Sequence, residues 1–324
     1  MSEFVVNYTT PDDVRLMHEI LSEYSEYSEY SEYFQKTIDC HNCGTAMRFL
    51  TAYFAQKTGS DVVLDCSTRM RERPIGQLVG ALRELGADIE YIEKEGFPPL
   101  KIRGTALQKK RVTICNPLST QFVSALLLIG VDVVTDCRSP YIQMTQEMLK
   151  SDLHRIPIER DWSAAAFWYE YVALNGGEMY LYGLQKDSTQ GDKAVADIFR
   201  QLGVETTYDR RGVTIRHTNH QLPQYAEFDF SDIPDLYPAV FATCHRLGIK
   251  MRFSGLERLP LKESNRLLAM RQILTASDKS KQLHTFADHR VSMAVLCAGY
   301  QVDNTECISK SYPQFLEQWR MLQS

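Results

Sequence analysis

The sequence predicts an α/β (α+β) protein built from duplicated units and divided into two similar domains. Three segments share one order of elements, in which apolar residues at helical spacing end in Leu-Gly and a strand follows. They read LVGALRELGADIEYI, VADIFRQLGVETTYD and VFATCHRLGIKMRFSG. Gly86, Gly203 and Gly248 stand where a left-handed residue ends a helix, which glycine tolerates because it has no Cβ. A second repeat is a strand that closes on Gly-Leu, in YLYGL at 180–184 and RFSGL at 252–256.

The length supports two domains. A chain of 324 residues with 44% hydrophobic content can bury two sizeable cores. We expect a shortened first domain at 1–158 and a second domain at 159–324. Gly176-Gly177 and the stretch just before Trp162 are the best candidates for boundary loops.

The composition excludes several classes of function. A formal net charge of −5 argues against nucleic-acid binding, so an anionic ligand needs a local cluster of Arg and Lys. The start resembles no signal peptide, and the apolar run FVSALLLIGVDVV is too short to span a membrane. We therefore expect a cytoplasmic monomer.

The eight cysteines are scattered along the chain. CHNC at 40–43 resembles half a zinc site or a redox pair, but no second pair follows at ligand spacing. We expect ordinary reduced thiols and no bound metal.

Several helix starts in the first half resemble anion sites. NCGTAMRFL offers Asn42, Gly44 and Thr45 at the start of a helix, with Arg48 one turn further. RMRERPIGQL sets Arg73 before Pro74, a residue suited to the first helical position. PLSTQFVSALL supplies Ser119, Thr120 and Gln121. Free backbone N–H groups and the helix dipole favour anions at such places, although Ser and Thr also cap helices with no ligand nearby.

The second half carries denser signals. FSDIPDLYPAV sets Asp235 before an apolar helix. Asp235 is expected either to cap this helix or to be an ionised group of a site. FADHRVSMAVLCAGY places Asp288, His289 and Arg290 at the head of a helix apolar enough to be buried, where charged groups need partners or a ligand. In CISKSYPQF, Lys310 is either a solvated loop lysine or part of the same site.

LKESNR at 261–266 brings Lys262, Glu263 and Arg266 within one turn. If this segment is helical, Lys262 and Arg266 lie four residues apart on one face, where two like charges require an anion between them. Arginine forks suit carboxylates and phosphates, and Glu263 and Asp235 could stay ionised or exchange a proton. The residues therefore predict a site for small polyanions with acid–base groups built in.

Ten motifs in order resemble the EPSP synthase family of enolpyruvyltransferases. From residue 40 to the end of the chain they are CGTAMRFLTA, RMRERPIGQLVGALRELGA, STQFVSALLL, SPYIQMT, DWSAAAFW, STQGDK, DIPDLYP, LKESNR, DHRVSMA and SKSYP. The resemblance implies two similar domains of repeated β-α-β-α-β-β units, arranged as an inside-out α/β barrel. It implies transfer of the enolpyruvyl group of phosphoenolpyruvate to the 5-hydroxyl of shikimate 3-phosphate, with release of phosphate, in aromatic amino acid biosynthesis. It implies no metal and no organic cofactor.

The same resemblance implies roles for single residues. Asp235 would take the 5-hydroxyl proton, Glu263 would handle the proton of the phosphoenolpyruvate methylene, and Lys262 would stand beside them. Phosphoenolpyruvate would be held by Gly44, Arg73, Gln121, Arg266, Arg290 and Lys310. Shikimate 3-phosphate would be held by Ser119, Thr120, Gln121, Arg138, Tyr141, Asp235, Arg258 and Lys262.

The sequence also departs from the family pattern. No Lys-Ser loop precedes TTPDDVRLM, and the connections around 130–136, 150–160 and 275–285 look shorter than usual. Arg138, Arg258 and Asn265 replace a family serine, asparagine and aspartate. Two alternatives therefore stay open: a relative that binds a phosphorylated ligand but turns over slowly, and enolpyruvyl transfer to another acceptor such as a UDP-sugar.

Overall fold

The computed structural model describes residues 5–6, 10–28, 35–108, 110–151, 159–275 and 282–323. Its chain separates into two compact units. The first unit is Asp13–Ile156, and the second unit combines Met1–Asp12 with Pro157–Ser324. Each unit has its own hydrophobic core.

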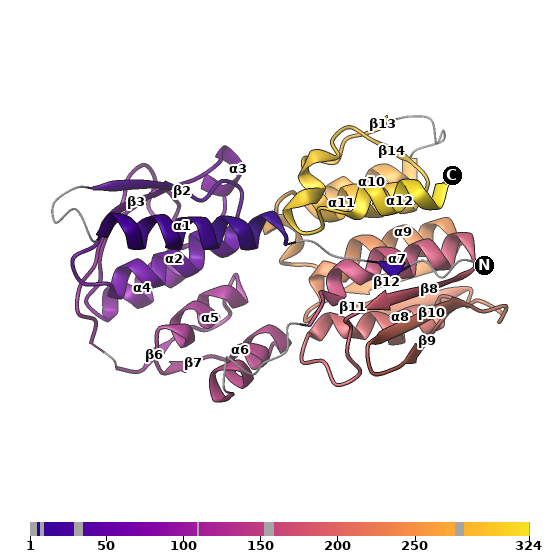
Figure 1. Ribbon diagram of the computed structural model, residues 1–324, viewed down its shortest axis with the longest axis horizontal. Helices are drawn as coiled ribbons and strands as arrows, with labels where there is room; N and C mark the ends of the chain where they lie inside the picture. The colour runs from indigo at the N-terminus through magenta and orange to yellow at the C-terminus, as the bar shows by residue number, and fades with distance from the viewer. Residues whose placement is uncertain are drawn as a thin grey trace. The chain divides into compact units, whose positions relative to one another are not determined.

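The first unit contains one complete β-α-β-α-β-β repeat, preceded by helix α1 (Figure 1). Its described strands pair in the order β2-β3-β5-β4, with β2 parallel to β3 and the remaining pairs antiparallel. Helices α2 and α4 pack together and bury Leu50, Phe54 and Leu82. The elements are α1 (Asp12–Ser28), β2 (Lys36–Asp39), α2 (Gly44–Gln56), β3 (Asp61–Asp65), α3 (Thr68–Arg71), α4 (Gly76–Glu84), β4 (Asp88–Tyr91) and β5 (Leu100–Arg103).

A shortened repeat follows in the first unit. Its described residues form β6 (Val112–Thr113), α5 (Thr120–Leu128), β7 (Val133–Val134) and α6 (Pro140–Lys150), a β-α-β-α order without a closing pair of strands up to residue 151. β6 and β7 pair in parallel. The short connection expected near 130–136 therefore coincides with a trimmed repeat. Those expected near 150–160 and 275–285 lie largely outside the described residues.

The second unit contains the other complete repeat. The strands described there pair in the order β1-β8-β10-β9, with the same sequence of parallel and antiparallel pairs as in the first unit. Figure 1 shows α7 lying along this sheet, and α7 contacts β8, β9 and β10. The elements are β1 (Val5–Val6), α7 (Trp162–Asn175), β8 (Glu178–Tyr182), η2 (Gly191–Ala194), α8 (Val195–Gln201), β9 (Val204–Tyr208) and β10 (Gly212–His217).

Two shortened repeats complete the second unit. In each, two described strands pair in parallel around a buried helix, α9 or α11. The first comprises β11 (Tyr225–Asp229), η3 (Pro234–Leu236), α9 (Tyr237–Arg246), β12 (Lys250–Ser254), η4 (Leu259–Leu261) and α10 (Arg266–Thr275). The second comprises β13 (Gln282–Leu283), α11 (His289–Cys297), β14 (Gln301–Val302), η5 (Glu306–Lys310) and α12 (Phe315–Gln323).

The predicted helix ends are confirmed. Gly86, Gly203 and Gly248 have φ of 95°, 95° and 69°, the left-handed region that glycine favours. The prediction for Pro74 is wrong, because α4 begins at Gly76 with Ile75 as its cap. No helix of the described segments combines the length and the apolarity that crossing a membrane requires.

Candidate functional site

The LKES segment lies at a change of backbone direction between two helices of the second unit. Pro260 fits the first turn of η4, and Lys262 follows it in an extended conformation with φ −78° and ψ −167°. α10 begins only at Arg266. The expectation that Lys262 and Arg266 share a helix face is therefore wrong, because Lys262 lies outside α10.

The two cations nevertheless converge on one anion, the carboxylate of Asp235. Its Oδ1 accepts a hydrogen bond of 2.6 Å from Arg266 Nη1 and lies 3.1 Å from Lys262 Nζ. Its Oδ2 lies 3.5 Å from Arg290 Nη2. Asp235 belongs to η3, whereas the cap of α9 is Leu236. The anion between Lys262 and Arg266 is thus a side chain of the protein itself.

Arg266 holds three carboxylates together. Its side chain is only 1% exposed, and beside Asp235 it binds Asp288 through Nε at 2.9 Å and Glu263 through Nη2 at 3.0 Å. Burial alone would lower the pKa of Arg266, but the three carboxylates raise it, so the guanidinium stays charged. A buried cation of this kind fixes where the carboxylates point.

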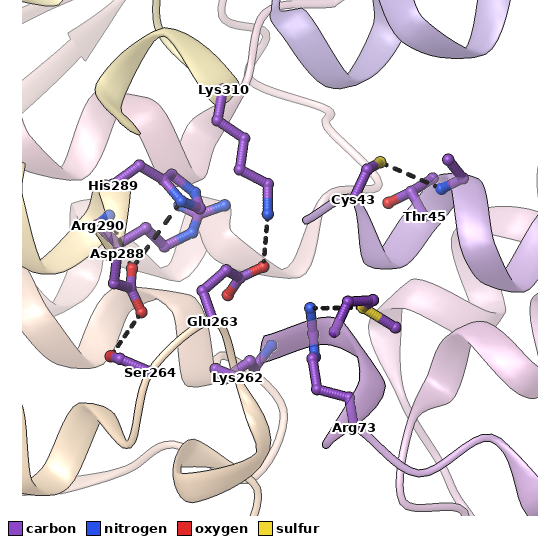
Figure 2. Close-up of polar contacts among 12 residues, drawn as sticks. Cys43, Thr45, Arg73, Lys262, Glu263, Ser264, Asp288, His289, Arg290 and Lys310 are labelled. Atoms are coloured by element: carbon purple, nitrogen blue, oxygen red, sulfur yellow. Dashed lines mark hydrogen bonds and ion pairs between the residues drawn. The ribbon is translucent and has the colours of Figure 1, made fainter. Parts of the chain in front are cut away.

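Glu263 bridges two cations. Its Oε2 accepts from Arg266, and its Oε1 accepts a 3.0 Å hydrogen bond from Lys310 Nζ (Figure 2). Lys310 ends η5, so this contact joins the LKES segment to the last part of the second unit. Lys310 is therefore a partly buried member of an ion-pair network and not a solvated loop lysine.

The head of α11 is built around Asp288. Its carboxylate is 0% exposed, caps the helix by accepting from the backbone N–H groups of Arg290 and Val291, and accepts from Ser264 Oγ at 2.9 Å. Burial opposes ionisation of Asp288, but Arg266 outweighs it and lowers the pKa of this carboxyl. The N-terminus of the helix favours the same negative charge.

His289 follows as a neutral side chain. Burial, and then the charges of Arg290 and Lys310, lower the pKa of its imidazole to about 3. The Nδ1 atom of His289 is buried and finds no hydrogen-bond partner among the described residues.

Arg290 presents an open donor. Its Nη1 is buried and has no hydrogen-bond partner in the part of the chain that the structure describes, while Nη2 is directed to Asp235. Burial opposes its charge, but Asp235 and Asp161 raise the pKa of Arg290 above its ordinary value. A charged donor without a partner is costly to bury and is the signature of a group that meets a ligand.

Asp235 and Lys262 both have lowered pKa values, but for different reasons. Burial by itself would raise the pKa of Asp235, but Arg290, Lys262 and Arg266 together hold it well below its usual range. Burial lowers the pKa of Lys262, against the attraction of Asp235. Asp235 is therefore a carboxylate, and Lys262 gives up its proton more easily than a surface lysine does.

A second group of predicted residues lies in the first unit, at the start of α2. Cys43 caps the helix by accepting from the N–H of Ala46 at 3.2 Å (Figure 2). A Cβ on Gly44 would lie 2.3 Å from Arg48 Nη1 and 3.0 Å from Arg73 Nη1, so a side chain here would displace the two guanidinium groups that approach the backbone.

Gln121 joins the start of α5 to this group. Its Oε1 accepts from Arg48 Nη1 at 2.7 Å, and its Nε2 donates to Thr45 Oγ1 at 2.9 Å. Ser119 caps α5 and Thr120 is its first residue, as expected, and both are half-buried. The structure thus gathers Gly44, Arg73 and Gln121 around a buried arginine, Arg48.

The other predicted residues lie at element ends. Arg138 is exposed just before α6, Tyr141 is half-buried in the first turn of α6, and Arg258 is half-buried at the start of η4. The roles implied by the family leave out three organising groups: Arg48, Ser264 and Asp288. The sequence patterns name Arg48 and Asp288 at helix starts, but they do not name Ser264. Asp288 carried a signal, since it begins an apolar helix, but its contact with Arg266 spans 22 residues and no local pattern announces it.

The repeats and the buried ion-pair network define an α/β protein of duplicated units whose second unit buries a cluster of carboxylates and cations. The comparisons with known proteins agree. The model of the family described as EPSP synthase (3-phosphoshikimate 1-carboxyvinyltransferase) matches residues 12–152 and 150–319. The chain belongs to the EPSP synthase family.

Relatives of this chain bear the same name. The 3-phosphoshikimate 1-carboxyvinyltransferase of Bacteroides fragilis is 34% identical, over 97% of this chain and 87% of the relative. That of Methanopyrus kandleri is 31% identical, over 87% of this chain and 77% of the relative. A solved structure of EPSP synthase from Acinetobacter baumannii shares the fold with a TM-score of 0.64 at 22% identity, over 88% of this chain and 78% of that one.

Proposed function

We propose that this chain is a 3-phosphoshikimate 1-carboxyvinyltransferase. It transfers the enolpyruvyl group of phosphoenolpyruvate to the 5-hydroxyl of shikimate 3-phosphate, forming a C–O bond and releasing inorganic phosphate. Family membership supports this activity, and so do relatives of that name that align along most of the chain. The reaction belongs to the biosynthesis of aromatic amino acids.

The observation that carries the proposal is the pair of carboxylates, Asp235 and Glu263, bound to one buried arginine, Arg266. Addition of an alcohol to an enol double bond requires a base for the hydroxyl proton and an acid for the methylene carbon. In our assignment Asp235 takes the 5-hydroxyl proton and Glu263 gives a proton to the methylene. Loss of a proton from the resulting methyl group then expels phosphate and restores the double bond.

The cations of the second unit hold the anionic substrates in this assignment. The open Nη1 of Arg290 donates to phosphoenolpyruvate, and Lys310 contributes a point charge. Arg266 lies in the same group, and its contacts with three carboxylates indicate that it mainly orients the acid–base residues. Lys262, which lies beside Asp235, binds shikimate 3-phosphate in this assignment. Arg258, nearby in the chain, binds the same substrate.

A second group of residues that we propose to bind the substrates lies in the first unit. Arg73, Gly44 and Gln121 serve phosphoenolpyruvate, and Arg48 supports Gln121 through the hydrogen bond between them. Gln121 also serves shikimate 3-phosphate, together with Ser119, Thr120, Arg138 and Tyr141. We further propose that the domains expected at 1–158 and 159–324 carry these two groups, except that residues 1–12 belong with the second unit.

The test mixes the protein with phosphoenolpyruvate and one acceptor at a time: shikimate 3-phosphate, shikimate or a UDP-sugar. Released phosphate and the mass of the product are measured. We expect phosphate and an enolpyruvyl ether with shikimate 3-phosphate, and neither with a D235N variant. Product from the UDP-sugar alone would assign the other acceptor class, and binding of shikimate 3-phosphate without any product would leave a ligand-binding relative.

A further inference from the structure

Two residues in the left-handed conformation stand directly before the helix that carries Arg290. Phe286 and Ala287, between β13 and α11, have φ of 56° and 51°. A residue with a Cβ is strained there, and such residues persist only where the surrounding structure imposes the conformation. Burial of these side chains does not impose it, because Phe286 is 47% exposed and Ala287 is exposed as well. The conformation is therefore held by the residues on either side of the turn.

Asp303, which follows β14, holds the residue before the turn. Its Oδ1 accepts two hydrogen bonds from Thr285, one from the backbone N–H at 2.8 Å and one from Oγ1 at 2.7 Å. Its Oδ2 pairs with Nδ1 of His284, and its backbone N–H donates to the carbonyl oxygen of Leu283 at 3.1 Å. Thr285 is fully buried, so the two hydrogen bonds that it donates are shielded from water. One carboxylate thus attaches the start of the turn to the end of β14.

Asp288, the cap of α11, closes the turn on its other side. Its backbone N–H donates to the carbonyl oxygen of Thr285 at 3.0 Å, and its Oδ1 accepts from the backbone N–H of Arg290 at 3.0 Å. Its Oδ2 accepts from Arg266 Nε. Hydrogen bonds therefore run without a gap from the carboxylate of Asp303, through Thr285 and Asp288, to the backbone of Arg290.

The residue after Asp303 holds α11 at a second point. Ser292 is fully buried, and its Oγ donates to the carbonyl oxygen of Asn304 at 3.1 Å. Asp303 and Asn304 thus contact the chain on both sides of Arg290, at Thr285 and at Ser292. The position of Arg290 is set by the connection that follows β14 as well as by its own helix.

We propose that Asp303 is a positioning residue for the anion site. By holding Thr285, it keeps the turn left-handed and so sets Arg290 where its open Nη1 donor meets phosphoenolpyruvate. The inference rests on the proposed function and adds a group that does not itself touch the substrate. Without Asp303 the turn relaxes toward conformations that residues with a Cβ prefer. The apparent affinity then falls in proportion to the fraction of molecules that keep the binding conformation.

Calorimetric titration with phosphoenolpyruvate alone tests the proposal. D303A removes the acceptor of both Thr285 hydrogen bonds and should bind phosphoenolpyruvate about fivefold to fiftyfold more weakly than the parent. Loss of a negative charge by itself would act in the opposite direction, because it makes the surroundings of a bound anion more positive. E306Q removes an exposed carboxylate three residues further along the chain and should bind like the parent.

The double variant D303A/A287G makes the test specific to the turn. Glycine adopts the left-handed conformation without strain, so the turn depends less on Asp303. We expect D303A/A287G to regain about threefold or more of the affinity that D303A loses. A287G alone should bind like the parent. A loss of packing elsewhere in the protein would not be restored by glycine at this one position.

T285V provides a second route to the same comparison. It removes the Oγ1 donor with little change in shape and keeps the backbone N–H, so it should lose part of the affinity that D303A loses. A287G should restore this loss as well. Thermal melting of every variant fixes a titration temperature at which all of them are folded, and T285V with and without A287G decides the question if D303A does not fold.

The outcomes separate the two claims. Equal affinities of D303A and the parent for phosphoenolpyruvate would overturn the role of Asp303 alone, and so would a loss of affinity that A287G does not restore. Failure of the parent to bind phosphoenolpyruvate would contradict the proposed function and this inference with it.

Discussion

Arg266 Nη1 donates a 2.6 Å hydrogen bond to Asp235 Oδ1, and this contact joins the first residue of α10 to η3, 31 residues earlier in the chain. It fixes the proposed base inside a group of cations. The consequences for stability and for activity differ from residue to residue, and they can be measured separately.

Replacing Arg266 should cost mainly stability. R266A leaves Asp235, Glu263 and Asp288 buried without their shared cation, and breaking one partner of a buried ion pair costs about 3–5 kcal/mol. Urea denaturation followed by circular dichroism measures this loss. R271A, on the same helix at an exposed position, is the matched control and should change the free energy of unfolding by less than about 0.5 kcal/mol. A stable R266A protein with weakened substrate binding would instead make Arg266 primarily a ligand.

Replacing Arg290 should cost mainly binding. Its open Nη1 is expected to make a charge-assisted hydrogen bond with phosphoenolpyruvate, which contributes about 1.5–3 kcal/mol, or roughly tenfold to a hundredfold in affinity. Calorimetry of R290A against the parent checks this. R290K is the second variant, and it should recover only part of the affinity because an ammonium lacks the planar fork. Unchanged affinity in R290A would remove this residue from the site.

E263Q should slow turnover while both substrates still bind. A positioned general acid–base group contributes about 10²–10⁴-fold in rate. Steady-state phosphate release gives kcat, and calorimetry gives the affinities. E306Q, on the 3-10 helix that ends in Lys310, removes an exposed carboxylate and should leave kcat unchanged. Equal kcat in E263Q and the parent would show that Glu263 only holds Lys310 and Arg266 in place.

A287G should stabilise the protein. Phe286 and Ala287 precede the cap of α11 with φ of 56° and 51°, a left-handed backbone that costs a residue with a Cβ about 1–2 kcal/mol. Glycine removes this strain. It also makes the unfolded chain more flexible, which offsets part of the gain, so we expect the free energy of unfolding to rise by about 0.5–1 kcal/mol. A298G, where φ is −70°, is the control and should destabilise instead. A lower melting temperature for A287G would show that the methyl group packs favourably.

The neutral state of His289 should make the folded protein sensitive to acid. Its pKa is about 3 in the folded state and near 6.5 when unfolded, so below pH 6.5 the unfolded chain binds a proton that the folded chain does not. The stabilising contribution of His289 is therefore present above pH 6.5 and is lost as the pH falls toward 3, by about 1.4 kcal/mol per pH unit. Asp192 acts in the opposite direction: with a folded pKa raised to about 6, it contributes stability at low pH that is lost as the pH rises through 6.

H289Q separates the two contributions. The free energy of unfolding is measured by urea denaturation between pH 4 and pH 6. In this range it should fall more steeply with rising pH in H289Q than in the parent, because the variant lacks the stability that His289 adds as the pH rises. H18Q, at an exposed position on α1, should keep the profile of the parent. Identical profiles for H289Q and the parent would mean that His289 is not held neutral by its surroundings.

The sequence by itself determined the repeated architecture and the types of residue in the site. Leu-Gly at three helix ends predicted the left-handed glycines, because that conformation depends on the absence of a Cβ at a single residue. The motifs around Asp235, Glu263 and Arg290 indicated an anion site because charge next to an apolar helix is a local property of the chain.

Only the tertiary structure decided which groups pair. Arg266 meets Asp288 and Asp235 across 22 and 31 residues, and Lys310 meets Glu263 across 47, so no periodicity could assign these partners. Lys262 and Arg266 do not share a helix, because Lys262 is extended and α10 begins at Arg266. Both cations pair with Asp235, which belongs to η3 of the same repeat. Burial decided the pKa values. Asp192 and His289 are ordinary ionisable residues in the sequence. The surrounding low-dielectric core raises the pKa of Asp192 toward neutrality and lowers that of His289 away from it.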